Sequence, residues 1–187
     1  MTLSPRAALL LIDIQQGLDE PRLGARNNPD AEKRIADLLT AWRAASRPVI
    51  HVQHMSLEPQ SPLREGLPGN AIKAEAKPIA GEPVFRKNVN SAFIGTDLEK
   101  HLRANRIDSL VMVGLTTDHC ISSTARMAGN LGFNVTVVGD ATAAHERRGP
   151  DGILYSADIM HRAALASLHG EFATVQSAQD VLAAVGA

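Results

Sequence analysis

The chain has little cysteine and few aromatic residues. Cys120 is the only cysteine among 187 residues, so no internal disulfide can form, and we expect a cytoplasmic protein rather than a disulfide-stapled secreted one. Aromatic residues make up 3% of the chain, which disfavours stacking platforms for nucleic-acid bases. The 19 Lys and Arg nearly balance the 20 Asp and Glu, so no strong positive field attracts nucleic acid or anionic membranes.

Long apolar runs are also absent. The N-terminal apolar run spans only residues 7–12, far short of the about 20 residues that a membrane span needs, and Asp13 follows it instead of a cleavage site. We therefore expect no signal peptide, no membrane anchor and no membrane partner. Because no repeat, low-complexity tract or polar linker interrupts the chain, residues 1–187 are predicted to form a single domain.

Short apolar runs alternate with longer amphipathic segments, and this alternation is typical of an α/β fold. A continuous apolar run suits a parallel strand that is covered on both faces. The predicted fold is a three-layer α/β/α, Rossmann-like, doubly wound sheet of about six mainly parallel strands. Strands are expected at residues 7–13, 48–54, 84–87, 109–115, 134–140 and 173–176. Helices are expected at residues 29–45, 96–105, soon after 115, 156–169 and 177–185.

Two sequence signals predict where helices begin. Asn28 is expected to be an N-cap, followed by Pro29 and Asp30 in the first turn. Thr96 and Glu99 have the spacing of a capping box, in which each side chain satisfies a backbone N–H at a helix start. Between the second and third strands, residues 55–83 form a long excursion rich in proline, and such loops are usually functional or mobile.

Three chemically useful residues follow strands of the predicted sheet. Asp13 ends the first strand, Lys87 ends the third, and Cys120 comes soon after the fourth. In open parallel sheets ligands bind beyond the carboxyl ends of the strands, so these side chains are expected at one edge. Asp13 follows five apolar residues and is therefore expected to be desolvated and in need of a cationic partner.

Each of these residues also has a simpler interpretation. Cys120 in a first helical turn would have a lowered pKa and act as a nucleophile, yet a lone cysteine is more often a small buried apolar residue. Asp13 could cap a turn that faces water, and Lys87 could be a solvated charge at a strand end. Position at the sheet edge is what favours the catalytic interpretation.

The seven histidines show no recognisable metal-binding spacing. His51 and His54 are three residues apart in one strand, so they leave opposite faces and cannot chelate one ion together. His101 and His161 are interpreted as partly buried or solvated helix residues. Neither GxxxxGK[ST] nor GxGxxG occurs, so a nucleotide cofactor has no support.

Three motifs together resemble those of the isochorismatase-like cysteine hydrolases, a superfamily that includes nicotinamidases and N-carbamoylsarcosine amidohydrolase. The motifs are LLLIDIQQ, SAFIGTDL and GLTTDHCISSTAR, and the resemblance covers essentially the whole chain. It implies a catalytic triad of Asp13, Lys87 and Cys120, the positions that the sheet edge had already indicated. It also implies a cis peptide at Leu115–Thr116 that turns the backbone N–H groups of Thr116 and Cys120 toward one point as an oxyanion hole.

Departures from the family patterns narrow the expected activity. Nicotinamidases carry an Asp-x-His metal motif where this chain has His54-Met55-Ser56, so we expect no catalytic metal and no cofactor. Isochorismatases proper lack the nucleophilic cysteine, so Cys120 favours cleavage of C–N bonds. His54, Phe93 and His119 are candidate substrate-binding residues, although each could instead serve packing or capping.

The sequence therefore predicts a metal-independent cysteine hydrolase that cleaves a small amide, carbamoyl or ureido compound through a thioester. One alternative is vinyl ether hydrolysis of the isochorismatase type, which would survive Cys120→Ala. Another is a non-catalytic redox or binding protein on the same scaffold. The resemblance also implies a homo-oligomer, either a dimer or a tetramer.

Overall fold

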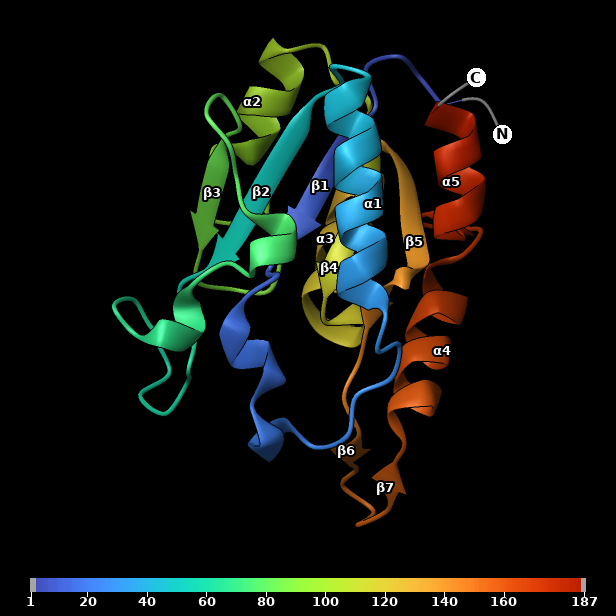
Figure 1. Cartoon of the computed structure of the whole chain (residues 1–187). Helices are drawn as coiled ribbons and strands as arrows, with labels where there is room; N and C mark the ends of the chain where they lie inside the picture. The colour runs from blue at the N-terminus through green and yellow to red at the C-terminus, as the bar shows by residue number, and fades with distance from the viewer. Residues whose placement is uncertain (1–2, 186–187) are drawn as a thin grey trace.

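A six-stranded parallel sheet forms the centre of the computed structural model, which describes residues 3–185 (Figure 1). The strand order is β3-β2-β1-β4-β5-β8, and every neighbouring pair is parallel. The strands are β1 (Ala8–Ile12), β2 (Val49–His54), β3 (Val84–Lys87), β4 (Ser109–Leu115), β5 (Asn134–Ala143) and β8 (Thr174–Gln176). The strand order reverses between β1 and β4. Ligands are expected to bind beyond the carboxyl ends of these two strands.

Helices cover both faces of the sheet, which confirms the predicted three-layer α/β/α fold. The helices are α1 (Ala31–Ala44), α2 (Leu98–Ala104), α3 (Ser122–Asn130), α4 (Ala157–Leu168) and α5 (Ala178–Val185). Residues of α1 and α5 share one apolar cluster with the sheet, whereas residues of α2, α3 and the end of α4 share the other. Figure 1 shows α1 lying across the near face of the sheet.

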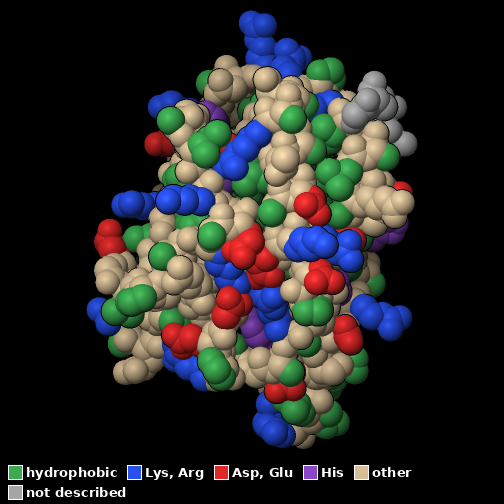
Figure 2. Space-filling view, viewed as in Figure 1, with side chains coloured by type: hydrophobic (Ala, Val, Ile, Leu, Met, Phe, Trp, Pro, Cys, Tyr) green, Lys and Arg blue, Asp and Glu red, His purple; other side chains and the backbone are tan. Residues whose placement is uncertain are grey.

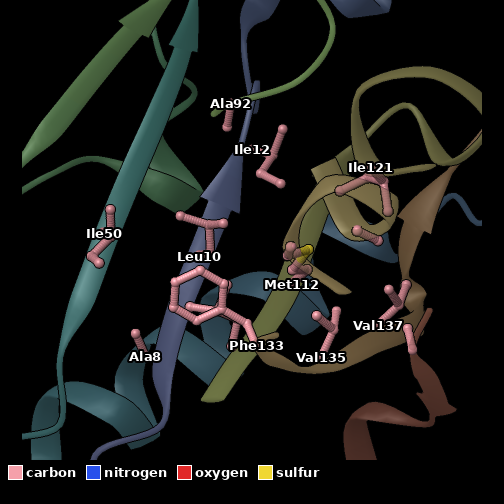
Figure 3. Close-up of a cluster of buried hydrophobic side chains, with 14 of the residues drawn as sticks. Ala8, Leu10, Ile12, Ile50, Ala92, Met112, Ile121, Phe133, Val135 and Val137 are labelled. Atoms are coloured by element: carbon pink, nitrogen blue, oxygen red, sulfur yellow. The ribbon is translucent and has the colours of Figure 1, made fainter. Parts of the chain in front are cut away.

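The apolar run of β1 is divided between these two layers. Leu10 and Ile12 point into the cluster on the α2 and α3 side, which Figure 3 shows together with Ile50 of β2 and Met112 of β4. The intervening Leu9 and Leu11 belong to the cluster on the α1 side. Because successive side chains of a strand alternate between faces, a strand covered on both sides has to be apolar at every position. This burial fixes the position of Asp13, the next residue.

Both predicted helix starts are wrong in detail. Helix α1 begins at Ala31 with Asp30 as its N-cap, while Asn28 lies outside the helix and donates its amide to the carbonyl oxygens of Gly139 and Thr142. Asn28 has a φ of 44°, a left-handed conformation that asparagine tolerates better than most residues. These bonds hold the Asn28 side chain against β5, so it does not cap α1.

The capping box at Thr96 and Glu99 does not form either. Helix α2 begins at Leu98 with Asp97 as its N-cap. Thr96 Oγ1 instead donates to Ala92 O at 2.6 Å and accepts from Leu98 N at 3.3 Å. The hydroxyl thus stabilises the turn that precedes the helix.

Several short elements escaped sequence analysis. An antiparallel hairpin of β6 (Arg147–Arg148) and β7 (Leu154–Tyr155) follows β5 and protrudes at the bottom of Figure 1. Four short 3-10 turns lie in the connections, namely η1 (Gln16–Asp19), η2 (Pro21–Leu23), η3 (Pro68–Asn70) and η4 (Ala74–Ala76). Segments this short lack a periodic apolar pattern, so the sequence carries little signal for them.

An ion-pair network holds the connection after β1 against α1. Lys73 Nζ lies 2.6 Å from both Asp19 Oδ1 and Glu32 Oε1, and Arg26 donates to both carboxylate oxygens of Glu32 at 2.7 and 2.8 Å. Figure 2 shows acidic and basic side chains intermingled over the middle of this face, without a large area of one sign. No helix within residues 3–185 is long and apolar enough to span a membrane.

Candidate active site

Asp13, Lys87 and Cys120 meet at the carboxyl edge of the sheet, where their positions at strand ends had placed them. Lys87 Nζ donates to Asp13 Oδ2 at 2.6 Å and to Cys120 Sγ at 3.3 Å. Asp13 and Lys87 are 1% and 2% exposed, so this ion pair lies away from water. A buried carboxylate and ammonium are stable only when they are paired, and the short contact supplies that pairing.

One carboxylate oxygen of Asp13 remains available. Asp13 Oδ2 is bonded to Lys87, whereas the buried Oδ1 has no hydrogen-bond partner among residues 3–185. The backbone of Asp13 has a φ of 52°, a sparsely populated conformation that tends to occur at functional sites. The turn at Asp13 thus places a buried carboxylate, with one oxygen bonded and the other unbonded, next to the thiol.

His54 is the fourth member of this group. Its Nδ1 lies 3.0 Å from Lys87 Nζ, and because an ammonium only donates, Nδ1 is the acceptor and carries no proton. Burial lowers the pKa of His54, and the neighbouring Lys87 charge lowers it further. The imidazole is therefore neutral, with its lone pair directed at the lysine.

Gln15 fixes His54 from behind and was missed by sequence analysis. Its fully buried amide donates to the His54 carbonyl at 3.0 Å and accepts from the His54 N–H at 2.9 Å. The same amide donates to the Asn70 carbonyl at 2.9 Å. Gln15 lies in the LLLIDIQQ motif, and its place in this motif is the only feature of the sequence that could have indicated a role for it. The local hydrophobic pattern does not explain a glutamine at this position.

Cys120 lies in a wide π turn, η5 (Thr117–Ile121), that leads into α3. Burial raises the pKa of the thiol, and the Asp13 carboxylate raises it further, whereas Lys87 acts in the opposite direction. The expectation of a lowered pKa is wrong for the resting protein, because desolvation outweighs the favourable helix end. Cys120 is thus a neutral thiol that needs a base before it can attack.

The backbone between β4 and Cys120 has the conformation that the family resemblance implies. The Leu115–Thr116 peptide is cis, and Thr116 and Thr117 are both buried. Just before it, Gly114 has a φ of 125°, and a Cβ atom there would lie 2.0 Å from Ile12 O. Glycine is required at this place because β1 and β4 approach too closely for a side chain.

A cavity of about 380 Å³ opens over these groups. This volume lies at the low end of the range for small-molecule sites. The predicted residues His54, Thr116 and His119 line it, whereas the structure places Phe93 elsewhere, with its ring stacked on Phe133 at 5.8 Å. Polar residues that line it and that sequence analysis missed are Arg22, Asn90, His145, Glu146 and Arg147.

The missed wall residues come from irregular segments. Arg22 belongs to η2, and Arg147 begins the β6–β7 hairpin. Arg147 lies 3.3 Å from Asp118 Oδ2, next to the turn that carries Cys120. Neither segment has a periodic apolar pattern, so the pattern of this sequence alone does not indicate that these residues line the cavity.

Three side chains of the group are also possible metal ligands. Ligand atoms of Asp13, His54 and Cys120 all lie within 4.8 Å of one another. Sequence analysis considered His54 only as a pocket residue and did not bring these three together. The chemistry of carboxylate, imidazole and thiolate fits a zinc-type ion, although Lys87 Nζ already contacts all three side chains.

Comparison with known proteins identifies the family of the chain. The isochorismatase domain matches residues 7–180. The isochorismatase family protein YrdC of Bacillus subtilis is 42% identical, over 95% of each chain. A crystal structure from Chromobacterium violaceum, described as of the isochorismatase family, superposes with a TM-score of 0.96 at 46% identity and covers 100% of this chain and 97% of that one.

A cysteine hydrolase from Pseudomonas syringae superposes with a TM-score of 0.90 at 25% identity, covering 100% of this chain and 95% of that one. The domain match spans nearly the whole chain, and its relatives share the sheet that brings Asp13, Lys87 and Cys120 together. The chain therefore belongs to the isochorismatase family of hydrolases.

Proposed function

We propose that this protein is a cysteine hydrolase that cleaves a C–N bond of a small amide, carbamoyl or ureido compound through a thioester. The observation that carries the proposal is the arrangement around Lys87, whose ammonium bonds Asp13 Oδ2 and Cys120 Sγ while Asp13 Oδ1 stays free. A nucleophile, a base and a group that orients the base are the parts that covalent catalysis requires.

In the first half of the reaction, Asp13 Oδ1 takes the proton of the Cys120 thiol. The resulting thiolate attacks the carbonyl carbon of the substrate, and the carbonyl oxygen becomes an oxyanion that the backbone N–H groups of Thr116 and Cys120 stabilise. The intermediate collapses when Asp13 returns the proton to the departing nitrogen. Ammonia or an amine leaves, and the acyl group stays on Sγ as a thioester.

In the second half, water replaces the amine. Asp13 takes a proton from this water, and the hydroxide attacks the thioester carbonyl. Collapse of the second intermediate breaks the C–S bond, and the proton held by Asp13 returns to the thiolate. Lys87 keeps Asp13 in place throughout, because its contact is with the other carboxylate oxygen.

Two relatives support hydrolysis by their names, and one of the two names, that of an amidohydrolase, supports cleavage of a C–N bond. The maleamate amidohydrolase of Pseudomonas putida is 29% identical over 95% of this chain, and a streptothricin hydrolase of Streptomyces noursei is 30% identical over 80% of it. The size of the cavity and its mixed polar and apolar wall also suit a small polar substrate. The identity of that substrate is the question for experiment.

The test is ammonia release from a panel of small amides, carbamoyl and ureido compounds, with wild type, Cys120→Ala and the half-buried control Ser123→Ala. We expect turnover by wild type and the control, loss in Cys120→Ala, and no effect of EDTA. Turnover of a vinyl ether that survives Cys120→Ala but not Asp13→Ala would instead establish ether hydrolysis. Turnover that EDTA removes would contradict the metal-independent mechanism.

Absence of turnover on every compound, with Cys120 no faster toward iodoacetamide than a free thiol, would favour the binding-protein alternative. Assembly into a dimer or a tetramer remains a prediction, which analytical ultracentrifugation would test.

A further inference from the structure

Lys87 occupies a position among three acceptors. Its Nζ lies 2.6 Å from Asp13 Oδ2, 3.0 Å from His54 Nδ1 and 3.3 Å from Cys120 Sγ. Its side chain has no exposed area, so water does not share this position with the ammonium. The three acceptors therefore surround one monovalent cation that belongs to the chain itself.

The same acceptors form a ligand set for a thiophilic metal. Zinc takes carboxylate oxygen, imidazole nitrogen and thiolate sulfur in tetrahedral sites, and open sites have three protein ligands with water as the fourth. Ligand atoms of Asp13, His54 and Cys120 already lie within 4.8 Å of one another. Because each of them faces the lysine nitrogen, all three face the same point.

Hydrogen bonds with two neighbouring side chains hold the backbone of His54 in place. Gln15 holds the His54 backbone on both sides, and the Nδ1 lone pair is directed toward Lys87. Asn70 Nδ2 donates to the His54 carbonyl at 2.8 Å and adds a further restraint. These bonds fix the backbone that carries the imidazole, so His54 presents Nδ1 to the same point as the other two acceptors.

We propose that Asp13, His54 and Cys120 form a binding site for a thiophilic divalent cation such as Zn²⁺, and that the ammonium of Lys87 occupies this site in the resting protein. Lysine at this position therefore has a second role, which is to exclude metal from the nucleophile. Binding of Zn²⁺ forms a Zn–S bond with loss of the thiol proton to solvent and requires the ammonium to leave. The site does not depend on the identity of the hydrolysed substrate.

Removal of the ammonium should expose the site. We would titrate Co²⁺ and Zn²⁺ into wild type, Lys87→Ala and Lys87→Arg, and follow the absorption of the thiolate–cobalt bond. We expect Lys87→Ala to bind one Co²⁺ at least 100-fold more tightly than wild type. Lys87→Arg keeps a cation in place and should resemble wild type.

Two double variants identify the ligands. Adding Cys120→Ser to Lys87→Ala should abolish the thiolate–cobalt absorption, and adding His54→Ala should weaken binding at least tenfold. Equal Co²⁺ affinity of wild type and Lys87→Ala, or an affinity that ignores His54→Ala, would overturn the proposal. Neither result depends on turnover. A negative cobalt titration would therefore leave the proposed C–N hydrolysis untouched, and absence of hydrolysis would not affect the interpretation of the cobalt spectrum.

Lys87→Ala leaves Asp13 without its partner and could prevent folding. In that case wild type supplies the test, because millimolar Zn²⁺ should protect Cys120 from alkylation by iodoacetamide. His54→Ala should reduce this protection at least tenfold, while Ala substitution of the exposed His169 should not change it. Equal protection in wild type and His54→Ala would overturn the proposal.

Discussion

His161 Nδ1 lies 2.8 Å from Thr117 Oγ1, and both side chains are buried. On the other side of the ring, His161 Nε2 lies 3.4 Å from the amide nitrogen of Asn28, which donates to two carbonyl oxygens of β5. Asn28 Nδ2 has two protons for these three acceptors, and the contact with Nε2 is the longest of them, so the short bond to Thr117 is the main anchor of the ring. Burial lowers the pKa of His161 and keeps the ring neutral.

This contact predicts a positioning role for His161, because Thr117 lies between Thr116 and Cys120. His161→Leu should lower kcat about tenfold or more with a much smaller change in KM, since the anchor of the turn is lost. His161→Gln retains an N–H donor and should recover part of the loss. Steady-state kinetics on the substrate identified by the amide panel would measure both.

The matched control for His161 is Arg162→Leu, an exposed neighbour on α4. It should leave kcat unchanged. A His161→Leu protein with normal kcat but a lower thermal midpoint would show that the contact serves stability alone.

Asp13→Asn should remove the base and lower kcat by about 10³-fold, within the range measured for loss of acid–base groups. Because burial and also the Asp13 carboxylate raise the pKa of the Cys120 thiol, Asp13→Asn should let the thiol react faster with iodoacetamide even though turnover falls. Asp37→Asn, an exposed change on α1, serves as the control. Slower alkylation in Asp13→Asn would contradict this effect of the Asp13 charge on the thiol, and unchanged kcat would show that Asp13 is not the base.

Gly114→Ala should destabilise the protein by about 3 kcal/mol or more, because a positive φ and a steric overlap act together. The new Cβ would lie 2.0 Å from Ile12 O at a φ of 125°. Gly132→Ala is the matched control, since its φ is 82° but its Cβ would meet nothing within 4 Å. We expect about 1 kcal/mol for that control, measured by urea unfolding, and similar losses at both positions would refute the steric argument.

Glu82 makes stability depend on pH below about 5. Burial opposes its ionisation, but hydrogen bonds from Arg43, the Ile79 N–H and His51 outweigh burial and lower the pKa of Glu82 to about 2 from its usual 4.5. A carboxylate with a lowered folded-state pKa stabilises the fold above its unfolded pKa, and this stability is lost as the pH falls from 4.5 toward 2.

Glu82→Gln should therefore lower the free energy of unfolding at pH 7 by on the order of 2 kcal/mol and flatten its decline between pH 5 and pH 2. Urea unfolding at several pH values measures this, with Gln substitution of the exposed Glu75 as the control. An unchanged slope in Glu82→Gln would assign the acid sensitivity to other carboxylates, such as Glu32, whose pKa is also about 2.

The sequence predicted the sheet and the three central site residues because both depend on strong, simple patterns. Continuous apolar runs mark buried parallel strands, and strand ends meet at one edge whatever the loops do. Asp13 follows β1 and Cys120 comes soon after β4, both apolar buried strands, whereas Lys87 is the last residue of the partly exposed β3.

The remaining features depend on contacts between distant segments. Asn28 is bonded to residues more than 100 positions away, a competition that no local helix signal reveals. The pKa of Cys120 is set by burial and by Asp13, and burial is known only after the fold is built. Arg22 and Arg147 reach the cavity from irregular turns, where side-chain direction has no periodic rule.

The strand order has a consequence for synthesis of the chain. Of the six strands of this sheet, β1 is synthesised before the others and lies between β2 and β4 in the finished sheet, so one of its two edges stays unpaired until residue 115 has emerged. Until then this apolar strand has an open edge that can pair with another nascent chain. The docking of β4 closes that edge and brings the nucleophile to its base, so the pairing of β1 and the assembly of the catalytic group are completed together, before β5 and β8 are synthesised.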